Sequence, residues 1–193
     1  MVEAGSDTTR NQNNCLVAAA ATDPSWVERV RKQLDEVCGH NAERLPQWSD
    51  YEKLPLIHAV IKETMRWRPN LTEAGFPHVL TEDMEFEGYY FEKGTTFTWN
   101  SWHITMSPEE YENPAAFVPE RYLNEHVFDV LEGNWGFGAG IKSNLCTLIS
   151  GRRVCVGYAI AARNMFMVFS RLLYCFDFAE DPVIPILNVS HFI

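Results

Sequence analysis

Large apolar residues recur at helical spacing in two segments of this chain, and a third segment is mostly apolar; these patterns constrain its fold more than any other feature. Segment 24–38 carries Trp26, Val27, Val30, Leu34 and Val37 at that spacing. Segment 55–68 carries Ile57, Val60, Ile61 and Met65. Segment 158–174 is apolar along most of its length. We therefore predict three helices, of which 24–38 is amphipathic.

Local residues mark the ends of the first two helices. Asp23 suits an N-cap, Pro24 suits the first helical position, and Gly39 is placed to end the helix. Pro69 stops the second helix, because proline lacks the amide donor that a continuing helix needs.

Between residues 71 and 101 the pattern changes from helical to extended. Threonine and aromatic residues are frequent there, and the glycines that separate short runs are Gly75, Gly88 and Gly94. Runs 85–91 and 95–99 predict strands of a small mixed sheet. Residues 107–123 predict turns with a short helix, and 134–157 predict a glycine-marked loop. The expected fold class is mostly α with a minor β part.

Composition argues against several partners and sites. A net charge of −10 opposes binding to a phosphate backbone, so no nucleic acid partner is expected. The apolar stretch 154–178 contains Arg163 and Arg171, which favour a buried helix over a membrane span. The five cysteines are scattered and include no Cys-x-x-Cys pair, which fits a reducing compartment better than a disulfide framework or a zinc site.

The loop before the third helix contains the most informative residue, Cys155. Arg152 and Arg153 precede it, and the helix predicted from residue 158 follows it. Positive side chains and unpaired helical N–H groups favour the anionic thiolate, which is the metal-ligating form. Neighbouring glycines let the backbone approach a flat cofactor closely. Taken alone, the cysteine is also consistent with a small apolar residue at the entrance of a buried helix.

With residues 141–151 set aside, the loop is Phe-Gly-Ala-Gly-Arg-Arg-Val-Cys-Val-Gly, starting at Phe137. This run resembles the haem-ligand loop of the cytochrome P450 family, Phe-x-x-Gly-x-Arg-x-Cys-x-Gly, at every fixed position. The resemblance implies that Cys155 is the axial thiolate ligand of haem b iron, within a ligand loop spanning 137–157. The other residues that it assigns to the cofactor are Phe137, Gly140, Gly157, Arg153 and His78. Of these, Arg153 and His78 would face haem propionates.

Residues 141–151 interrupt this loop, and two explanations stay open. One is a genuine insertion that bulges out while its ends remain paired. The other is translated non-coding sequence such as an unspliced intron. We favour the second, because a glycine codon can hold a GT donor and the Ser150–Gly151 junction can hold an AG acceptor. Cys146 lies inside the segment and is expected to be incidental.

Glu63 and Arg66 share one face of the helix predicted over 55–68. Alone, this spacing fits a solvated pair that contributes less than about 1 kcal/mol. Downstream, segment 117–123 contains Pro-Glu-Arg-Tyr. Both elements resemble the family's Glu-x-x-Arg helix and Pro-Glu-Arg element. The resemblance implies a buried network of Glu63, Arg66 and Arg121 that holds the surroundings of the ligand loop.

The run Ala-Gly-Ser-Asp-Thr-Thr at positions 4–9 suits a capped helix start. It also resembles the family's oxygen-activation motif, at the end of a distal helix that would cover 1–21. The resemblance implies that Asp7 and Thr8 are catalytic groups that relay protons. It further implies a substrate pocket lined by Leu71, Thr72, Ala74, Gly75 and Phe76.

The resemblance covers essentially all of the chain, as one incomplete domain from the C-terminal part of the cytochrome P450 fold. It implies a haem-thiolate monooxygenase that acts on a small apolar organic substrate with electrons from an NADPH-cytochrome reductase. The aromatic-rich sequence is similar in style to fungal microsomal members. An intact relative is expected on the cytosolic face of the endoplasmic reticulum membrane, and this chain in the cytoplasm.

Two alternatives remain beside that activity. Because the oxygen-activation motif stands at the very start, we expect a truncated chain that is inactive alone, or a pseudogene-like product that binds no haem. A haem-thiolate isomerase or dehydratase, which needs no reductase, is the other alternative.

Overall fold

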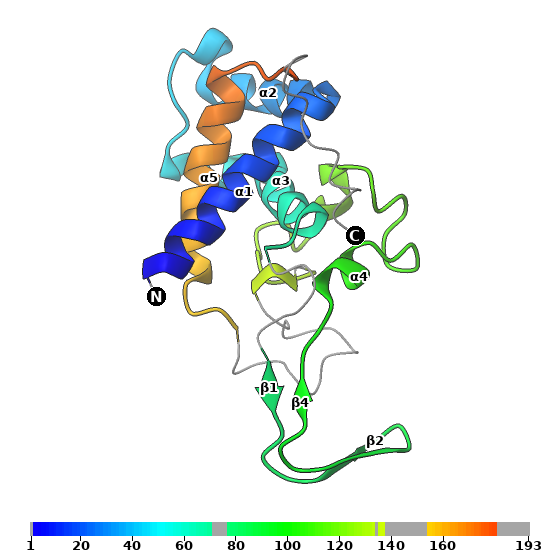
Figure 1. Cartoon of the computed structure of the whole chain (residues 1–193). Helices are drawn as coiled ribbons and strands as arrows, with labels where there is room; N and C mark the ends of the chain where they lie inside the picture. Colours follow the sequence, from blue (N-terminus) through cyan, green and yellow to red (C-terminus); the bar gives the residue numbers. More distant parts are fainter. Residues whose placement is uncertain (1, 71–76, 134, 138–153, 181–193) are drawn as a thin grey trace.

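Four helices pack together in the computed structural model: α1 (Val2–Thr22), α2 (Ser25–Cys38), α3 (Pro55–Trp67) and α5 (Tyr158–Cys175). In Figure 1, α3 lies among the other helices, and a β ribbon extends away from the helical part. The structure describes residues 2–70, 77–133, 135–137 and 154–180. The three predicted helices, 24–38, 55–68 and 158–174, all form, with ends within one residue of the predicted ones. The fold is mostly α with a minor β part, as predicted.

The boundary between α1 and α2 differs from the prediction by one residue. Pro24 is the N-cap of α2, and Ser25 is its first residue. Asp23 still acts locally, because its Oδ1 accepts a hydrogen bond from the Ser25 amide at 3.0 Å. Gly39 ends the helix as predicted, in a left-handed conformation with φ of 89°.

Within the described residues, four short strands form two separate antiparallel pairs and not the predicted mixed sheet. Strand β1 (His78–Val79) pairs with β4 (Thr96–Phe97), and β2 (Met84–Phe86) pairs with β3 (Tyr89–Phe91). Run 85–91, predicted as one strand, is a hairpin. Glu87 and Gly88 have φ of 50° and 83°, which reverses the chain in a two-residue turn.

Short elements connect these units. Helix α4 (Ser101–Thr105) is capped by Asn100, whose Oδ1 accepts a hydrogen bond from the His103 amide at 2.9 Å. The 3₁₀ turns are His40–Ala42, Trp48–Lys53, Pro119–Tyr122 and Trp135–Phe137. In the part of the chain that the structure describes, no helix combines the length and apolar character needed to cross a bilayer.

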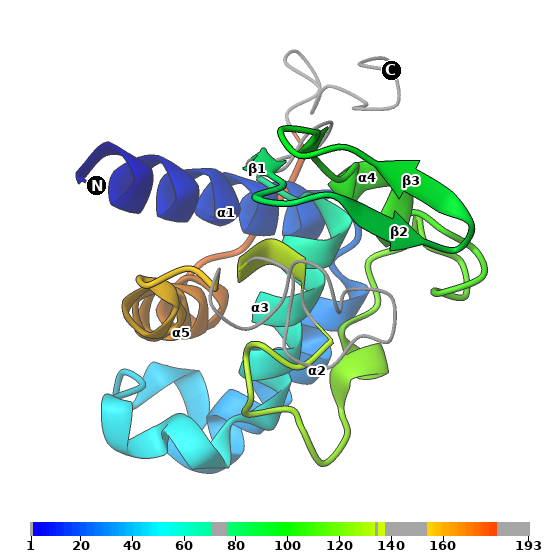
Figure 2. The same cartoon turned by 90° about the horizontal axis from the view of Figure 1, so that it is seen from below.

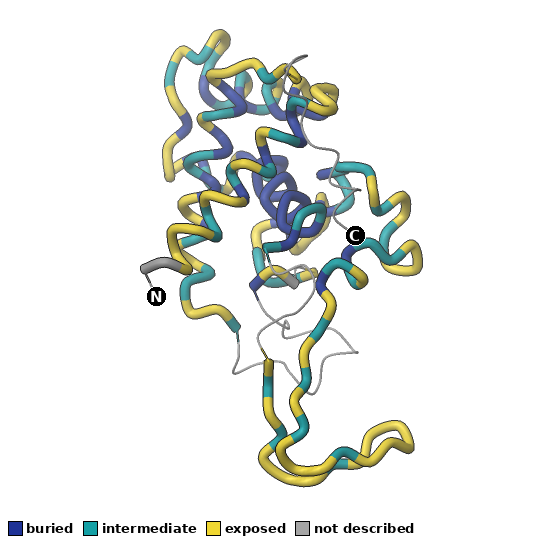
Figure 3. Tube along the Cα trace, viewed as in Figure 1, coloured by how far each residue is buried: buried dark blue, intermediate teal, exposed yellow. Residues whose placement is uncertain are grey.

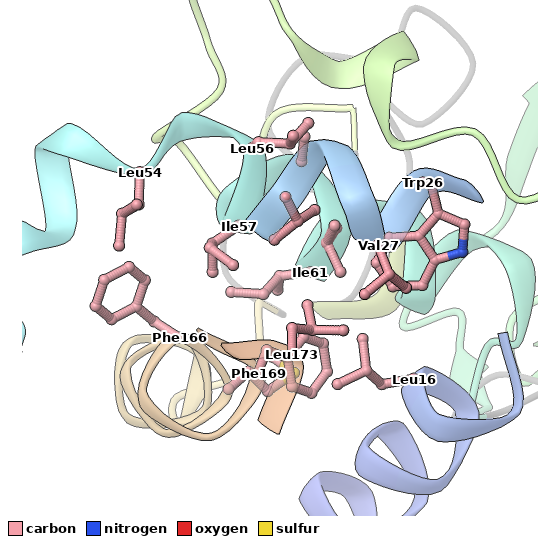
Figure 4. Packing of buried hydrophobic residues seen from close by; sticks show 14 of the residues in the cluster. Leu16, Trp26, Val27, Leu54, Leu56, Ile57, Ile61, Phe166, Phe169 and Leu173 are labelled. Atoms are coloured by element: carbon pink, nitrogen blue, oxygen red, sulfur yellow. The ribbon is translucent and has the colours of Figure 1, made fainter. Parts of the chain in front are cut away.

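Helix α3 is the centre of the core. Every residue from Leu56 to Arg66 is buried, and Figure 3 shows α3 as an almost continuous buried segment. In Figure 4, Ile57 and Ile61 of α3 lie close to the apolar side chains of α5 and α1. Those partners are Phe166, Phe169, Leu173 and Leu16, and each is fully buried. The buried faces of the helices therefore position the polar residues that α3 also carries.

Candidate cofactor site

A cavity of about 930 Å³ lies between the first half of α1, the end of α3, β1 and the start of α5. Ligand and cofactor pockets in proteins have volumes of about 300–1,000 Å³. Figure 2 shows the two helices α1 and α5 side by side, and they are in direct contact. The cavity residues that the sequence assigned to catalysis or to the cofactor are Asp7, Thr8, His78, Phe137, Cys155 and Gly157, and Arg66 of the predicted ionic network also lines it.

Cys155 is held at the cavity by its backbone. Its amide donates a hydrogen bond to the Phe137 carbonyl at 2.8 Å, and its own carbonyl accepts from the Tyr158 amide at 3.2 Å. The side chain is exposed and carries a free thiol. Phe137 is buried, and its ring meets the Tyr158 ring edge-on, with centroids 6.3 Å apart. The two ends of the predicted ligand loop thus lie together, just before α5.

Asp7 and Thr8 reach the cavity from α1. Asp7 Oδ1 accepts a hydrogen bond from Arg10 Nη2 at 2.8 Å. Both side chains are more than half exposed, at 54% for Asp7 and 71% for Arg10, so this ion pair contributes little stability. The carboxylate next to Thr8 therefore has a cationic partner of its own at the cavity edge.

His78 lies on β1, opposite Phe97 of β4. Its ring stacks on the Trp99 ring with centroids 6.0 Å apart, and both side chains line the cavity. The β1–β4 pair thus places one imidazole at the wall of the cavity.

Glu63, Arg66 and Arg121 form a buried ionic network beside the cavity. Glu63 and Arg66 are joined by two hydrogen bonds, from Arg66 Nε to Oε2 at 2.7 Å and from Nη2 to Oε1 at 2.8 Å. Arg121 Nε reaches Glu63 Oε1 at 3.3 Å. The side chains are 0%, 1% and 15% exposed in that order, so this is not the solvated pair that the spacing alone would fit.

The network also holds backbone groups of the segment after α4. Arg66 donates to the carbonyls of Thr105, Pro114 and Ala116 at 2.8–3.1 Å. Glu63 Oε1 accepts from the Val118 amide at 2.8 Å. Two side chains of α3 therefore fix the path of the chain over 105–118.

An amide cluster that the sequence did not reveal joins α1 to the chain leaving α3. Asn70 Oδ1 accepts hydrogen bonds from Asn11 Nδ2 at 3.0 Å and from Gln12 Nε2 at 3.1 Å. Gln12 Nε2 also donates to the Arg68 carbonyl at 2.9 Å. The polar run 10–14 inside an otherwise helix-favouring stretch was the available signal.

Several predicted residues lie outside the described part of the chain. They are Gly140, Arg153, Leu71, Thr72, Ala74, Gly75, Phe76 and the whole of 141–151, including Cys146.

Comparisons of the chain with a family model, with known proteins and with solved structures all identify the same family. The family model described as Cytochrome P450 matches residues 1–191. Over 191 residues the chain is 38% identical to "Cytochrome P450 monooxygenase patH" of Penicillium expansum, covering 95% of this chain and 34% of the relative. It is 36% identical over 191 residues to "Cytochrome P450 monooxygenase atE" of Aspergillus terreus, covering 94% and 33%.

A zebra fish cytochrome P450 solved with progesterone superposes with a TM-score of 0.75 at 34% identity, covering 93% of this chain and 38% of that one. The chain spans about a third of the length of the curated relatives it matches. The family model, the relatives and the fold agree, and the chain belongs to the cytochrome P450 family.

Proposed function

We propose that this chain supplies the haem-holding part of a haem-thiolate monooxygenase, with Cys155 as the axial ligand. The observation that carries the proposal is a cysteine, fixed through its backbone to Phe137, that lines a cavity of about 930 Å³ together with Asp7 and Thr8. Thiolate-ligated haem supplies iron chemistry in which electron donation from sulfur favours O–O cleavage.

The residues present fit haem b. A porphyrin brings four nitrogen ligands of its own, so the protein has to add one axial ligand, and Cys155 offers a single free thiol at the cavity. More of the cavity lining is apolar than polar, which suits a flat macrocycle, and Phe137 and Gly157 lie on either side of the cysteine in sequence. His78 at the wall is a donor for a propionate, a role in which Arg153 and Gly140 would assist.

Asp7 and Thr8 take the proton-handling role in this proposal. Thr8 has a hydroxyl that can both donate and accept, and it stands beside a carboxylate at the cavity. Arg10 keeps Asp7 oriented through the 2.8 Å hydrogen bond. Glu63, Arg66 and Arg121 have a structural role, since their partners are one another and the backbone.

The remaining parts of the proposal concern the whole protein. Its electrons would come from an NADPH-cytochrome reductase, and its substrate would be a small apolar organic molecule bound near residues 71–76. The endoplasmic reticulum membrane, on the cytosolic face, is where an intact relative would act. Relatives named as monooxygenases support the need for an electron donor and an organic substrate.

The test compares Cys155→Ser with Cys175→Ser in the full chain. Cys175 is a matched control, because it is also an exposed free cysteine but ends α5 away from the cavity lining. Each purified protein is titrated with haem, reduced and exposed to carbon monoxide. We expect the thiolate-type Soret band from the parent chain and Cys175→Ser, and its complete loss in Cys155→Ser.

Two results would contradict the proposal. Cys155→Ser could retain the same band as the parent, which would place the ligand elsewhere. Alternatively, the parent chain could fold with native helical content yet retain no haem, which would favour a non-catalytic product.

A further inference from the structure

Lys62 is a buried lysine next to Glu63 on α3, and the ionic network described above does not include it. The residue is only 2% exposed, which is rare for a lysine. Adjacent residues of an α-helix point about 100° apart. Lys62 and Glu63 therefore reach different stretches of chain, although they are neighbours in sequence.

The ammonium group of Lys62 holds a loop by its carbonyls. Nζ donates to the His126 carbonyl at 2.7 Å and to the Glu132 carbonyl at 3.2 Å. It also lies 5.8 Å from the centroid of the Tyr122 ring, within range of a cation–π contact. Burial lowers the pKa of Lys62, while the carboxylates of Asp129 and Glu132 act in the opposite direction. The two carbonyls and the ring compensate in part for the desolvation of the charge.

The loop held by Lys62 leads directly to the ligand loop. Segment 123–133 is followed within a few residues by Phe137, whose carbonyl accepts from the Cys155 amide. Gly133 and Gly136, just after the Glu132 carbonyl, line the cavity together with Phe137. The 3₁₀ turn Trp135–Phe137 also packs on α3. Lys62 therefore contacts Glu132, five residues before Phe137 in the sequence, and Phe137 in turn contacts Cys155.

We propose that Lys62 is a positioning residue: by holding the His126 and Glu132 carbonyls it fixes segment 123–133 and, through Phe137, the placement of the Cys155 sulfur. The part that concerns the sulfur rests on the proposed function, whereas the part that concerns the segment does not. Together with Glu63 and Arg66, Lys62 makes α3 the support of two consecutive stretches, 105–118 and 123–133.

The first test is hydrogen–deuterium exchange on the haem-free full chain, and so it is independent of haem. Lys62→Met removes the ammonium and keeps a long apolar side chain, and Lys62→Arg keeps the charge and its donors. Lys53→Met is the control, because the Lys53 side chain is 62% exposed and its ion pair with Asp50 is 3.7 Å long. We expect amides of 124–133 to exchange at least about tenfold faster in Lys62→Met, since hydrogen bonds to charged groups are lost. Exchange in α1 and α2 should be unchanged.

The second test uses ligation as its readout. In the reduced carbon monoxide complex, Lys62→Met should show a smaller thiolate-type fraction and a larger neutral-thiol fraction than the parent at equal haem content. Lys62→Arg should lie between the two, and Lys53→Met should match the parent. A purely structural role would lower the amount of folded protein but leave this ratio unchanged.

The outcomes separate the two proposals. If the parent binds no haem, the proposed function fails, while the exchange experiment still tests the hold on 123–133. Equal exchange of 124–133 in the parent and Lys62→Met would overturn the inference. If Lys62→Met does not fold, Lys62→Gln takes its place, because it removes the charge and shortens the side chain: faster exchange confined to 124–133 supports the inference, and exchange equal to the parent or raised throughout the chain overturns it.

Discussion

Glu63→Gln is expected to lower the free energy of unfolding by about 3–5 kcal/mol. The substitution keeps the shape of the side chain but removes the negative charge that faces Arg66 and Arg121. Arg66 is 1% exposed, so its guanidinium would remain buried without a counter-ion. An amide N–H would also face guanidinium donors where a carboxylate oxygen now accepts. Urea unfolding followed by circular dichroism measures the loss.

A surface pair provides the control for this prediction. Arg29 Nε and Glu120 Oε1 are 2.6 Å apart, but their side chains are 51% and 35% exposed. Glu120→Gln should therefore cost less than about 1 kcal/mol. The double variant Glu63→Leu/Arg66→Met should recover part of the loss, because it removes the stranded charge as well. A cost for Glu63→Gln no larger than that for Glu120→Gln would show that the network does not stabilise the fold.

The free energy of unfolding should also fall by about 3 kcal/mol as the pH drops from 6.5 to 4, because His58 is protonated in the unfolded chain over this range. Burial lowers the pKa of His58 from 6.5 to about 4, and nearby Lys62 acts in the same direction. A hydrogen bond of 3.0 Å between His58 Nε2 and the Tyr51 carbonyl raises the pKa of His58, but its effect is smaller than that of burial. The imidazole is packed among aromatic rings, including Phe166 in a stacked arrangement with centroids 5.3 Å apart.

The sign of this effect follows from which state binds the proton first. As the pH falls through 6.5 the unfolded chain takes up a proton, while the folded chain resists until about pH 4. The stability from neutral His58 is thus complete above 6.5 and lost between the two values. Urea unfolding at several pH values measures it, with His40→Gln as the control, since the His40 side chain is 87% exposed. His58→Gln should flatten the profile in this window, and an unchanged profile would contradict the assignment.

Apolar spacing was enough to predict the helical part of this fold. The apolar spacing in 24–38 and 55–68 and the apolar composition of 158–174 reflect one-sided or complete burial, and burial of these side chains stabilises α2, α3 and α5. The hairpin was missed, because an aromatic-rich run predicts extended chain without saying where it reverses. Gly88 was the available signal, and it lies inside the run as the second turn residue.

Residues of the candidate site could be predicted from the sequence only where they belong to a short motif. Spacing put Glu63 and Arg66 on one helix face, but it fits a surface pair equally well, and only packing around α3 reveals that the pair is buried. The sequence analysis did not identify Lys62 or Gln12 as residues that hold the chain. Their partners are backbone carbonyls far along the chain, at His126, Glu132 and Arg68, and a carbonyl leaves no trace in the side-chain pattern.

The hydrogen bond between the Cys155 amide and the Phe137 carbonyl also bears on how this family can vary in length. The entropy lost on closing a chain grows only with the logarithm of the number of residues between its ends. Residues 138–154 separate the two groups, and removing 141–151 would change that cost by only about 1 kcal/mol. Residues gained or lost at this point therefore change the free energy of folding little, provided that the two bonded ends keep their hydrogen bond.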